Sequence, residues 1–435
     1  MTRRLKQVLV GIYLMGLASI SHGQGALELV ITSGVTDPTP IAIVPFGWEG
    51  GTALAEDVAQ VIEDDLSSTG RFLPFPRRNM LEQPTDDYEV DLDDWGLLGV
   101  EFVVIGKILP SQSGMVDIRY SLFDVVKRER LASQIVKARA DRMRSAGHFI
   151  ADEIYEALLG QRGIFSTRIA YVTQSEAGDF ELVVADADGE NAKTVVRARE
   201  PIMSPAWSPD SEQLAYVIFE EGGSAIYIRN IYSGAATRVS ARQGVNGAPA
   251  FSPDGQMLAL TLSSRTGNLD VYTLDLNTQE LNRITRSSAI DTEPAWSMDG
   301  QTLYFNSDRS GGPQIYSVPV AGGNPSRITF EGRYNARPRV APDGRSLAVV
   351  HENDGQYQIG RVDLITGGLT LLSDGRLDES PSIAPNGAVL IYATSRGRLG
   401  GLATVSSDGQ VKRELNSKGT SVREPVWSPF PLETN

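Results

Sequence analysis

The 435-residue chain contains no cysteine. This absence excludes disulfides, thiolate nucleophiles, cysteine metal sites and a lipid-modified cysteine behind a leader. Histidine is almost as scarce, with His22, His148 and His351 as the three examples. A histidine-based catalytic triad is poorly supported by so few candidates, and the stability of the fold must come from packing.

Several catalytic motifs are also lacking. The sequence has no Gly-x-Ser-x-Gly elbow, and Gly106-Lys107 lacks both the preceding glycine-rich loop and the following Ser or Thr of a Walker motif. The segment Asp186-Ala187-Asp188-Gly189 resembles part of a calcium loop, but no downstream glutamate fits and its register is that of a turn between strands. We therefore expect no catalytic residue, no metal and no cofactor.

Basic residues are fewer than acidic ones. The chain has 40 Lys and Arg against 54 Asp and Glu, for a formal net charge of −14. The pairs Arg77-Arg78 and Lys127-Arg128 stand outside any sustained basic stripe, so we interpret them as solvated surface. This balance argues against nucleic acid as a partner.

The composition, 41% hydrophobic and 22% charged, is that of a globular protein and not of a multispanning membrane protein. A short apolar run, Val8 to Ile20, follows the basic residues Arg3, Arg4 and Lys6. Small residues then follow at Ser21 and Gly23, so residues 1–23 are predicted to be a signal peptide, with a mature chain beginning near Gln24 in the periplasm. An uncleaved membrane anchor is the alternative.

One proline-led phrase recurs through the second half of the chain. Its leading prolines are Pro205, Pro249, Pro294, Pro338, Pro381 and Pro425. The intervals between them are 44, 45, 44, 43 and 44 residues, which is the length of one four-stranded propeller blade. Most copies continue as Ser-Pro-Asp-Gly or a close variant, which predicts a tight turn because Pro presets φ and Gly tolerates a positive φ.

Strand-like runs follow the turns at constant spacing. Five of them begin nine residues after a leading proline: 214–217, 258–261, 303–306, 347–350 and 390–393. A further second strand, Ile169 to Val172, has no first strand before it, and Pro425 to Ser428 is a first strand with no second strand after it. We therefore predict an all-β six-bladed propeller over residues 166–435, closed by pairing of the C-terminal strand with the blade that begins near Ile169.

The segment before the propeller alternates strands and helices. Strands are predicted at 41–46, 102–108, 116–126 and 131–138, and helices at about 53–66 and 142–159. These elements predict an α/β domain over residues 37–160, joined to the propeller by a linker at about 160–166. Residues 24–36 precede it as an arm with a short strand-like segment and a turn rich in Gly and Pro.

Loops that join one blade to the next gather at one end of a propeller channel, where several can touch one ligand. Polar residues precede the repeat prolines in these loops: Asn246, Asp291, Thr292, Glu293, Asn335, Arg337, Asp378, Glu379, Arg423 and Glu424. They predict a charged, mainly acidic mouth. Solvated connecting loops are the simpler interpretation of these residues taken alone.

The chain resembles the TolB family of the Tol-Pal cell-envelope system across nearly its whole mature length. The resemblance rests on the arm Ile31-Thr32-Ser33-Gly34-Val35, the strand Pro40 to Phe46 and the six proline-led repeats. Propeller repeats alone also occur in peptidases and other proteins, so the arm and the α/β domain ahead of a six-copy array make the match specific.

The resemblance implies two protein partners. The propeller would bind the lipoprotein Pal, and the arm Leu27, Glu28, Leu29, Val30, Ile31, Thr32, Ser33, Gly34 and Val35 would bind the membrane-anchored TolA. Asn246-Gly247-Ala248-Pro249 and Thr292-Glu293-Pro294 look like segments of the Pal-binding mouth, so Ala248 joins the candidates above. Val245 departs from a histidine that relatives can have there, which puts a histidine-dependent contact in doubt.

The expected protein is a non-enzymatic adaptor, monomeric alone, with bacteriocins and other envelope proteins as further partners that family members can have. Two other classes remain open at this stage. One is an envelope hydrolase or lyase that uses the channel, with the acidic mouth as its catalytic set. The other is a scaffold without a specific ligand, against which the strand-forming arm argues.

Overall fold

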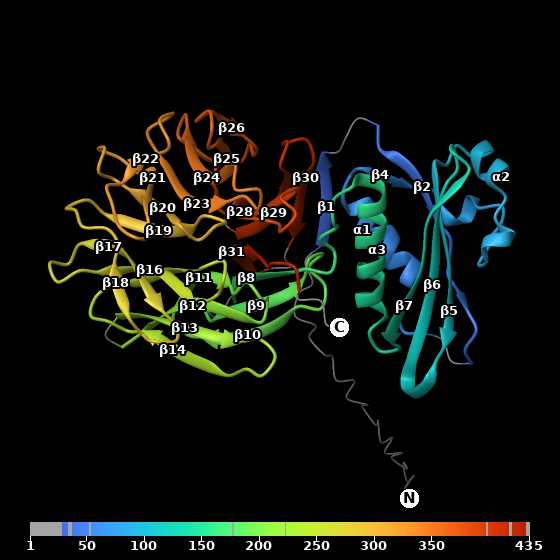
Figure 1. Cartoon of the computed structure of the whole chain (residues 1–435), viewed down its shortest axis with the longest axis horizontal. Helices are drawn as coiled ribbons and strands as arrows, with labels where there is room; N and C mark the ends of the chain where they lie inside the picture. Colours follow the sequence, from blue (N-terminus) through green and yellow to red (C-terminus); the bar gives the residue numbers. More distant parts are fainter. Residues whose placement is uncertain are drawn as a thin grey trace, which may run out of the picture.

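The computed structural model describes residues 28–33, 37–51, 54–175, 178–221, 223–396, 399–416 and 420–431. They form an α/β domain beside a ring of six β-sheet blades (Figure 1), which confirms the predicted fold class. The predicted signal peptide lies outside the described residues. Within those residues, no helix combines the length and apolar character needed to cross a membrane.

The N-terminal domain is built on one mixed sheet with strand order β4-β2-β5-β6-β7, and β3 also pairs with β5. Its strands are β2 (Thr39–Ile43), β3 (Gly47–Trp48), β4 (Phe72–Pro74), β5 (Phe102–Pro110), β6 (Met115–Asp124) and β7 (Glu129–Arg139). Strand β2 runs parallel to β4 and β5, whereas β5, β6 and β7 are antiparallel. Helices α1 (Val58–Ser68) and α3 (Met143–Leu159) pack on one face, and α2 (Leu92–Leu97) packs on the other.

The two long helices have clear boundaries. Helix α1 begins later than the predicted residue 53 because the Asp57 side chain accepts a hydrogen bond from the Gln60 backbone N–H and caps the helix there. Helix α3 ends as predicted, at Gly160, whose φ of 69° is left-handed. The two helices approach closely at Gly147, where a Cβ would lie 2.8 Å from Val61 Cγ1.

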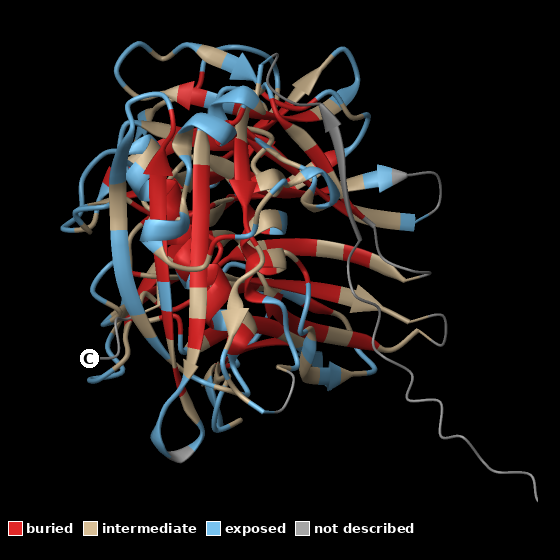
Figure 2. Cartoon of the chain, turned by 90° about the vertical axis from the view of Figure 1, so that its right-hand side faces the viewer, coloured by how far each residue is buried: buried red, intermediate tan, exposed pale blue. Residues whose placement is uncertain are grey.

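Each blade is an antiparallel sheet whose first strand lies nearest the channel. The four blades with consecutive strands are β11–β14 (Ile202–Trp207, Gln213–Glu220, Gly223–Asn230, Ala236–Ser240), β15–β18 (Asn246–Phe251, Met257–Ser263, Leu269–Asp275, Leu281–Arg283), β19–β22 (Asp291–Trp296, Thr302–Ser307, Gln314–Pro319, Ser326–Arg327) and β23–β26 (Asn335–Val340, Ser346–Asn353, Gln356–Asp363, Leu369–Leu371). Figure 2 shows buried residues running along the strands and exposed residues in the connecting turns.

The repeated turn has a recurring hydrogen-bond pattern. In one copy, Ser252 Oγ donates to Asp254 Oδ1 at 2.5 Å and accepts from the Met257 N–H at 2.9 Å. Gly255 completes the turn with a φ of 71°, as the sequence predicts. Asp186 to Gly189 also forms a turn between two strands, with the Gly189 N–H donating to the Asp186 carbonyl, which confirms that interpretation.

The ring closes through the C-terminal strand. Strand β31 (Ser421–Trp427) pairs with β8 (Arg168–Gln174), and β9 (Phe180–Asp186) and β10 (Lys193–Ala198) complete that blade. The register places Trp427 opposite Ile169. The Trp427 indole N–H also donates to Thr167 Oγ1 at 2.7 Å. The predicted closure is confirmed.

The sixth blade carries an additional strand. It consists of β27 (Asp378–Ile383), β28 (Val389–Arg396), β29 (Leu399–Ser406) and β30 (Lys412–Asn416), and β1 (Glu28–Ser33) pairs antiparallel with the outer edge of β30. The N-terminal segment therefore covers an edge of the propeller, between β30 and α1 in Figure 1. Asn386 in this blade donates to the Arg162 carbonyl at 2.9 Å, next to the junction with the N-terminal domain.

Candidate functional site

The inner strands share an unusual backbone feature beside the channel. In each, the residue before the repeat proline has a left-handed φ of 45–54°, although none is glycine. These residues are Ser204, Ala248, Glu293, Arg337, Ser380 and Glu424. The pairing register to the next strand shifts at each of these positions, as in a β-bulge.

The proline explains the bulge, because it has no N–H to give to the ladder. A left-handed conformation of a residue with a side chain costs about 1–2 kcal/mol, and such strain concentrates at functional sites. Ser204 and Ser380 belong to this ring but were not among the predicted mouth residues. Taking the residue before each repeat proline as a candidate would have included both.

Charged side chains of this ring interact across blades. Arg337 lies 3.6 Å from Glu424 Oε1 and also donates to Ser380 Oγ. Burial alone would lower the pKa of Arg337, but the carboxylates of Glu293, Glu424 and Glu379 raise it. These contacts concentrate both signs of charge around the channel.

A second arginine, Arg339, which the prediction did not include, lies two residues after Arg337 on β23. Arg339 Nη2 is 3.8 Å from Glu293 Oε2, and burial lowers the pKa of Arg339. Arg339 and Glu293 line a channel cavity of about 390 Å³, together with Trp207, Trp296 and Trp427. A cavity of this size can accept a side chain or a short peptide segment.

Five predicted mouth residues are buried: Glu424 is 7% exposed, and Asn246, Asp291, Asn335 and Asp378 are at most 1% exposed. Each of the last four is the first residue of its inner strand, and its hydrogen bonds hold the entering loop or, for Asp291, a neighbouring arginine. Asn246 Oδ1, for example, accepts from the Arg242 N–H at 2.9 Å, and both Asp291 oxygens accept from Arg309 Nη2 at 2.9 Å. These side chains support the rim and are not presented to a partner in this structure.

Asn335 and Asp378 hold the rim in the same manner. Asn335 Nδ2 donates to the Glu331 carbonyl at 2.8 Å, and Asp378 Oδ2 accepts from the Gly375 N–H at 3.0 Å. His351 Nδ1 lies 2.9 Å from Asn335 Oδ1, so this histidine serves the same network.

The other predicted mouth residues are partly exposed: Ala248, Thr292, Glu293, Arg337, Glu379 and Arg423. Thr292 Oγ1 has one long hydrogen bond, 3.5 Å from Asn306 Nδ2. The Arg423 guanidinium stacks 5.0 Å from the centre of the Phe180 ring. Solvent can therefore reach part of each of these six residues.

The arm residues divide between described and undescribed positions. Glu28, Leu29, Val30, Ile31, Thr32 and Ser33 form β1, with Leu29 opposite Leu415 and Ile31 opposite Arg413. Leu27, Gly34 and Val35 lie outside the described residues. The backbone of β1 thus occupies the outer edge of the sheet whose inner strand, β27, carries Asp378 and Glu379.

One cluster of the described residues has the composition of a metal site, namely Asp65, His148 and Asp188. Its groups already have partners, since His148 Nδ1 lies 2.6 Å from Asp65 Oδ2 and Arg144 pairs with Asp188. The cluster joins α1 and α3 to the turn between β9 and β10. We interpret it as an interdomain contact.

The chain is similar to known proteins in both of its domains. The family model described as the TolB amino-terminal domain matches residues 27–131, and the TolB beta propeller domain matches residues 155–431. A Tol-Pal system protein TolB from Alcanivorax borkumensis is 46% identical over 94% of each chain, and one from Thioalkalivibrio sulfidiphilus is 45% identical over 94% of each. The crystal structure of TolB from Acinetobacter baumannii has a TM-score of 0.86 at 39% identity, covering 93% of this chain and 100% of the other. The chain therefore belongs to the TolB family of Tol-Pal system proteins of the cell envelope.

Proposed function

We propose that this protein is a periplasmic adaptor with two partner sites. The propeller mouth binds the lipoprotein Pal, and the N-terminal arm binds TolA. Through these contacts the protein serves outer-membrane integrity and constriction during cell division. The observation that carries the proposal is the ring of left-handed residues at the channel, which presents Glu293 and Arg337 beside partly exposed Thr292.

The mouth suits a protein ligand with a mixed polar surface. Glu293 and Arg337 offer opposite charges, and the channel cavity lined by Trp296 and Trp427 offers apolar contact. Aromatic and arginine side chains dominate binding energy at protein interfaces. Asn246, Asp291, Asn335 and Asp378 take part as supports of the rim, because their side chains are buried.

The arm suits recognition by strand pairing. A short strand that pairs with a sheet edge of its own chain can also pair with a sheet edge of another protein. In this structure β1 pairs with the outer edge of β30. A partner that pairs with β1 along the same edge must therefore displace β30. The same sheet carries mouth residue Glu379 on β27, which gives a physical connection between the two sites.

That connection makes coupling between the partners testable. If Pal binding changes TolA affinity by some factor, TolA binding must change Pal affinity by the same factor. The docked arm defines one of the two states that such coupling needs.

Calorimetry with the soluble domain of Pal tests the mouth. Thr292→Arg and Glu293→Lys should each weaken binding about tenfold or more, because both place a wrong charge or bulk at a packed contact. Thr292→Arg disturbs only the 3.5 Å contact with Asn306, so the fold should be kept. Glu212→Lys makes the same charge change as Glu293→Lys, at an exposed turn, and is the matched control for that variant. Unchanged Pal affinity in both mouth variants would move the site elsewhere.

A further inference from the structure

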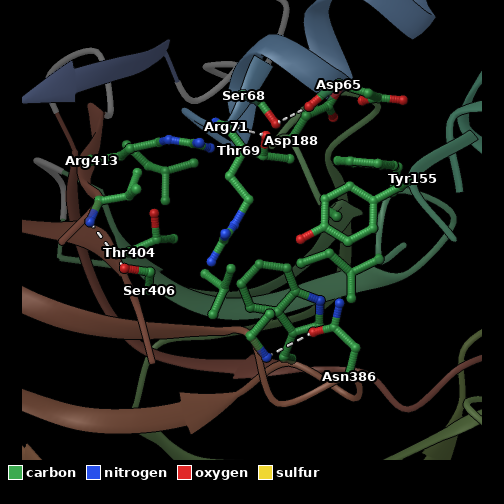
Figure 3. Close-up of a pocket in the computed structure, with 18 residues that line it drawn as sticks. Asp65, Ser68, Thr69, Arg71, Tyr155, Asp188, Asn386, Thr404, Ser406 and Arg413 are labelled. Atoms are coloured by element: carbon green, nitrogen blue, oxygen red, sulfur yellow. Dashed lines mark hydrogen bonds between the residues drawn. The ribbon is translucent and has the colours of Figure 1, made fainter. Parts of the chain in front are cut away.

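A cavity of about 70 Å³ lies where the N-terminal domain meets the sixth blade (Figure 3). Both domains supply its walls. Thr69 and Arg71 follow α1, and Tyr155 lies on α3, whereas Thr404 is on β29 and Arg413 on β30. The cavity adjoins the two proposed partner sites without being part of either. Trp427 also lines the channel cavity, and Arg413 and Leu415 lie on β30, the strand that pairs with β1.

Arg413 is the unusual residue of this cavity. It is 9% exposed, and its Nε is buried without a hydrogen-bond partner. No described residue forms an ion pair with its guanidinium. Burial lowers the pKa of Arg413 to about 10, so the group is still charged at neutral pH. A buried charge without a partner is strongly unfavourable, and a guanidinium has five N–H donors to satisfy.

Other donors converge on the same space. Figure 3 shows Arg71, Arg413 and Tyr155 reaching toward the cavity from different walls. Burial raises the pKa of Tyr155, while Arg71 and Arg413 both act to lower it, which places the two cations near this phenol. None of the described residues hydrogen-bonds the Tyr155 hydroxyl. Arg71 has one distant ion pair, 3.8 Å from Asp408, and keeps donors for a second partner.

Two carboxylates also line the cavity, but their charges are already compensated. Asp65 Oδ2 lies 2.6 Å from His148 Nδ1, and Asp188 pairs with Arg144. Arg413 has no equivalent partner. The uncompensated charge in the cavity is therefore positive.

We propose that this interdomain cavity binds a small oxyanion, a carboxylate or a phosphate, between Arg413, Arg71 and the Tyr155 hydroxyl. Planar guanidinium groups pair with both kinds of oxyanion. One water needs about 10–15 Å³ of such space, so the cavity has room for a group of several non-hydrogen atoms. Apolar side chains form much of the remaining wall: Ile164, Phe165, Val411, Leu415 and Trp427. An anion held by residues of both domains favours their docked arrangement.

Thermal unfolding of the whole mature protein tests the site, with sodium phosphate and sodium acetate compared separately against sodium chloride at equal ionic strength. A ligand of the folded state raises the unfolding temperature, and above its dissociation constant the rise continues with the logarithm of the ligand concentration. We expect phosphate, acetate or both to raise this temperature in that manner, and the salt that responds identifies the anion. Isothermal calorimetry with the responding anion should give one site per chain.

Variants connect the effect to the cavity. Arg413→Met should lose the anion-dependent shift and should unfold in chloride at a temperature no lower than the parent, because it removes an uncompensated buried charge. Arg71→Gln should reduce the shift and provides the test if Arg413→Met does not fold. Arg345→Met removes the same charge at an exposed turn and should keep the full shift. Absence of any shift beyond chloride, or an unchanged shift in Arg413→Met or in Arg71→Gln, would overturn the proposal.

Discussion

A chain that ends at Thr420 lacks β31 and should lose the stability of the whole propeller. Strand β31 is the inner strand of the blade that β8 to β10 begin, so its removal leaves β8 unpaired on the channel side. The remaining ring has two open ends where the complete protein has none. The effect should therefore spread beyond one blade.

The magnitude follows from the side chains that β31 buries. Val422 is 0% exposed, and Trp427 is 8% exposed and hydrogen-bonded to Thr167. Burial of a valine contributes about 1.5–3 kcal/mol, and loss of a buried tryptophan costs about 3–5 kcal/mol, which together give about 5–8 kcal/mol. This loss is comparable with the total stability of a typical domain, about 5–15 kcal/mol.

Urea denaturation followed by circular dichroism measures the effect. The control chain ends at Pro431 and keeps every described strand. We expect the control to match the parent and the chain ending at Thr420 to unfold at much lower urea or to be unfolded without denaturant. Cooperative unfolding of the shorter chain at the parental midpoint would refute closure by β31 as a source of stability.

Two further predictions concern the N-terminal domain and its contact with the propeller. Burial alone would lower the pKa of His148, but Asp65 and Asp188 raise it above 6.5, with Arg144 opposing them. The stability that protonated His148 contributes is therefore fully present below about pH 6.5. It is lost as the pH rises through the raised pKa. The difference in unfolding free energy between the parent and His148→Asn should therefore shrink from pH 6.5 to pH 9 in urea titrations, and a constant difference would contradict the assignment. Gly147→Ala should lower the unfolding free energy by about 1–3 kcal/mol, because its Cβ would lie 2.8 Å from Val61 Cγ1. Gly96→Ala places its Cβ at an ordinary 3.7 Å from Val125 and should be tolerated, so equal losses in the two variants would argue against the close helix contact.

The propeller could be predicted because its information is local and repeated. A turn such as Ser252 to Gly255 needs only its own side chains to form, and six spaced copies determine the blade count. The offset between Ile169 and Pro425 also predicted the closing pair, because only the C-terminal strand was left to complete the ring. Helix α1 was less accurate at its start, where one capping residue, Asp57, decides the boundary.

The candidate site was harder to predict, because polar residues in loops look alike whether they are solvated or buried. Asn246 and Asp291 were grouped with Thr292 and Glu293 as mouth residues, but the first two bury their side chains to satisfy loop backbone or Arg309. Such bonds depend on tertiary contacts that the sequence does not contain. The left-handed conformation of Ser204 and Ser380 was also not predicted, because serine is not a residue type that indicates a positive φ.

The pairing of strands that are far apart in the sequence could not be predicted from local patterns either. The strand character of residues 28–33 could be predicted, but not its position on β30, almost 400 residues further along the chain. Edge pairing requires a free edge of matching length, and several outer blade strands offer one. The cavity around Arg413 depends on the same docking of two domains.

The most direct test of the two-site account is to delete residues 24–35 and measure both partners by calorimetry. The variant lacks β1 and keeps the mouth, so we expect TolA binding to vanish, Pal binding to survive and thermal unfolding of the propeller to change little. The expected survival of Pal binding also reports that the shortened protein is folded. TolA binding retained by this variant would remove the arm from the mechanism and contradict the account.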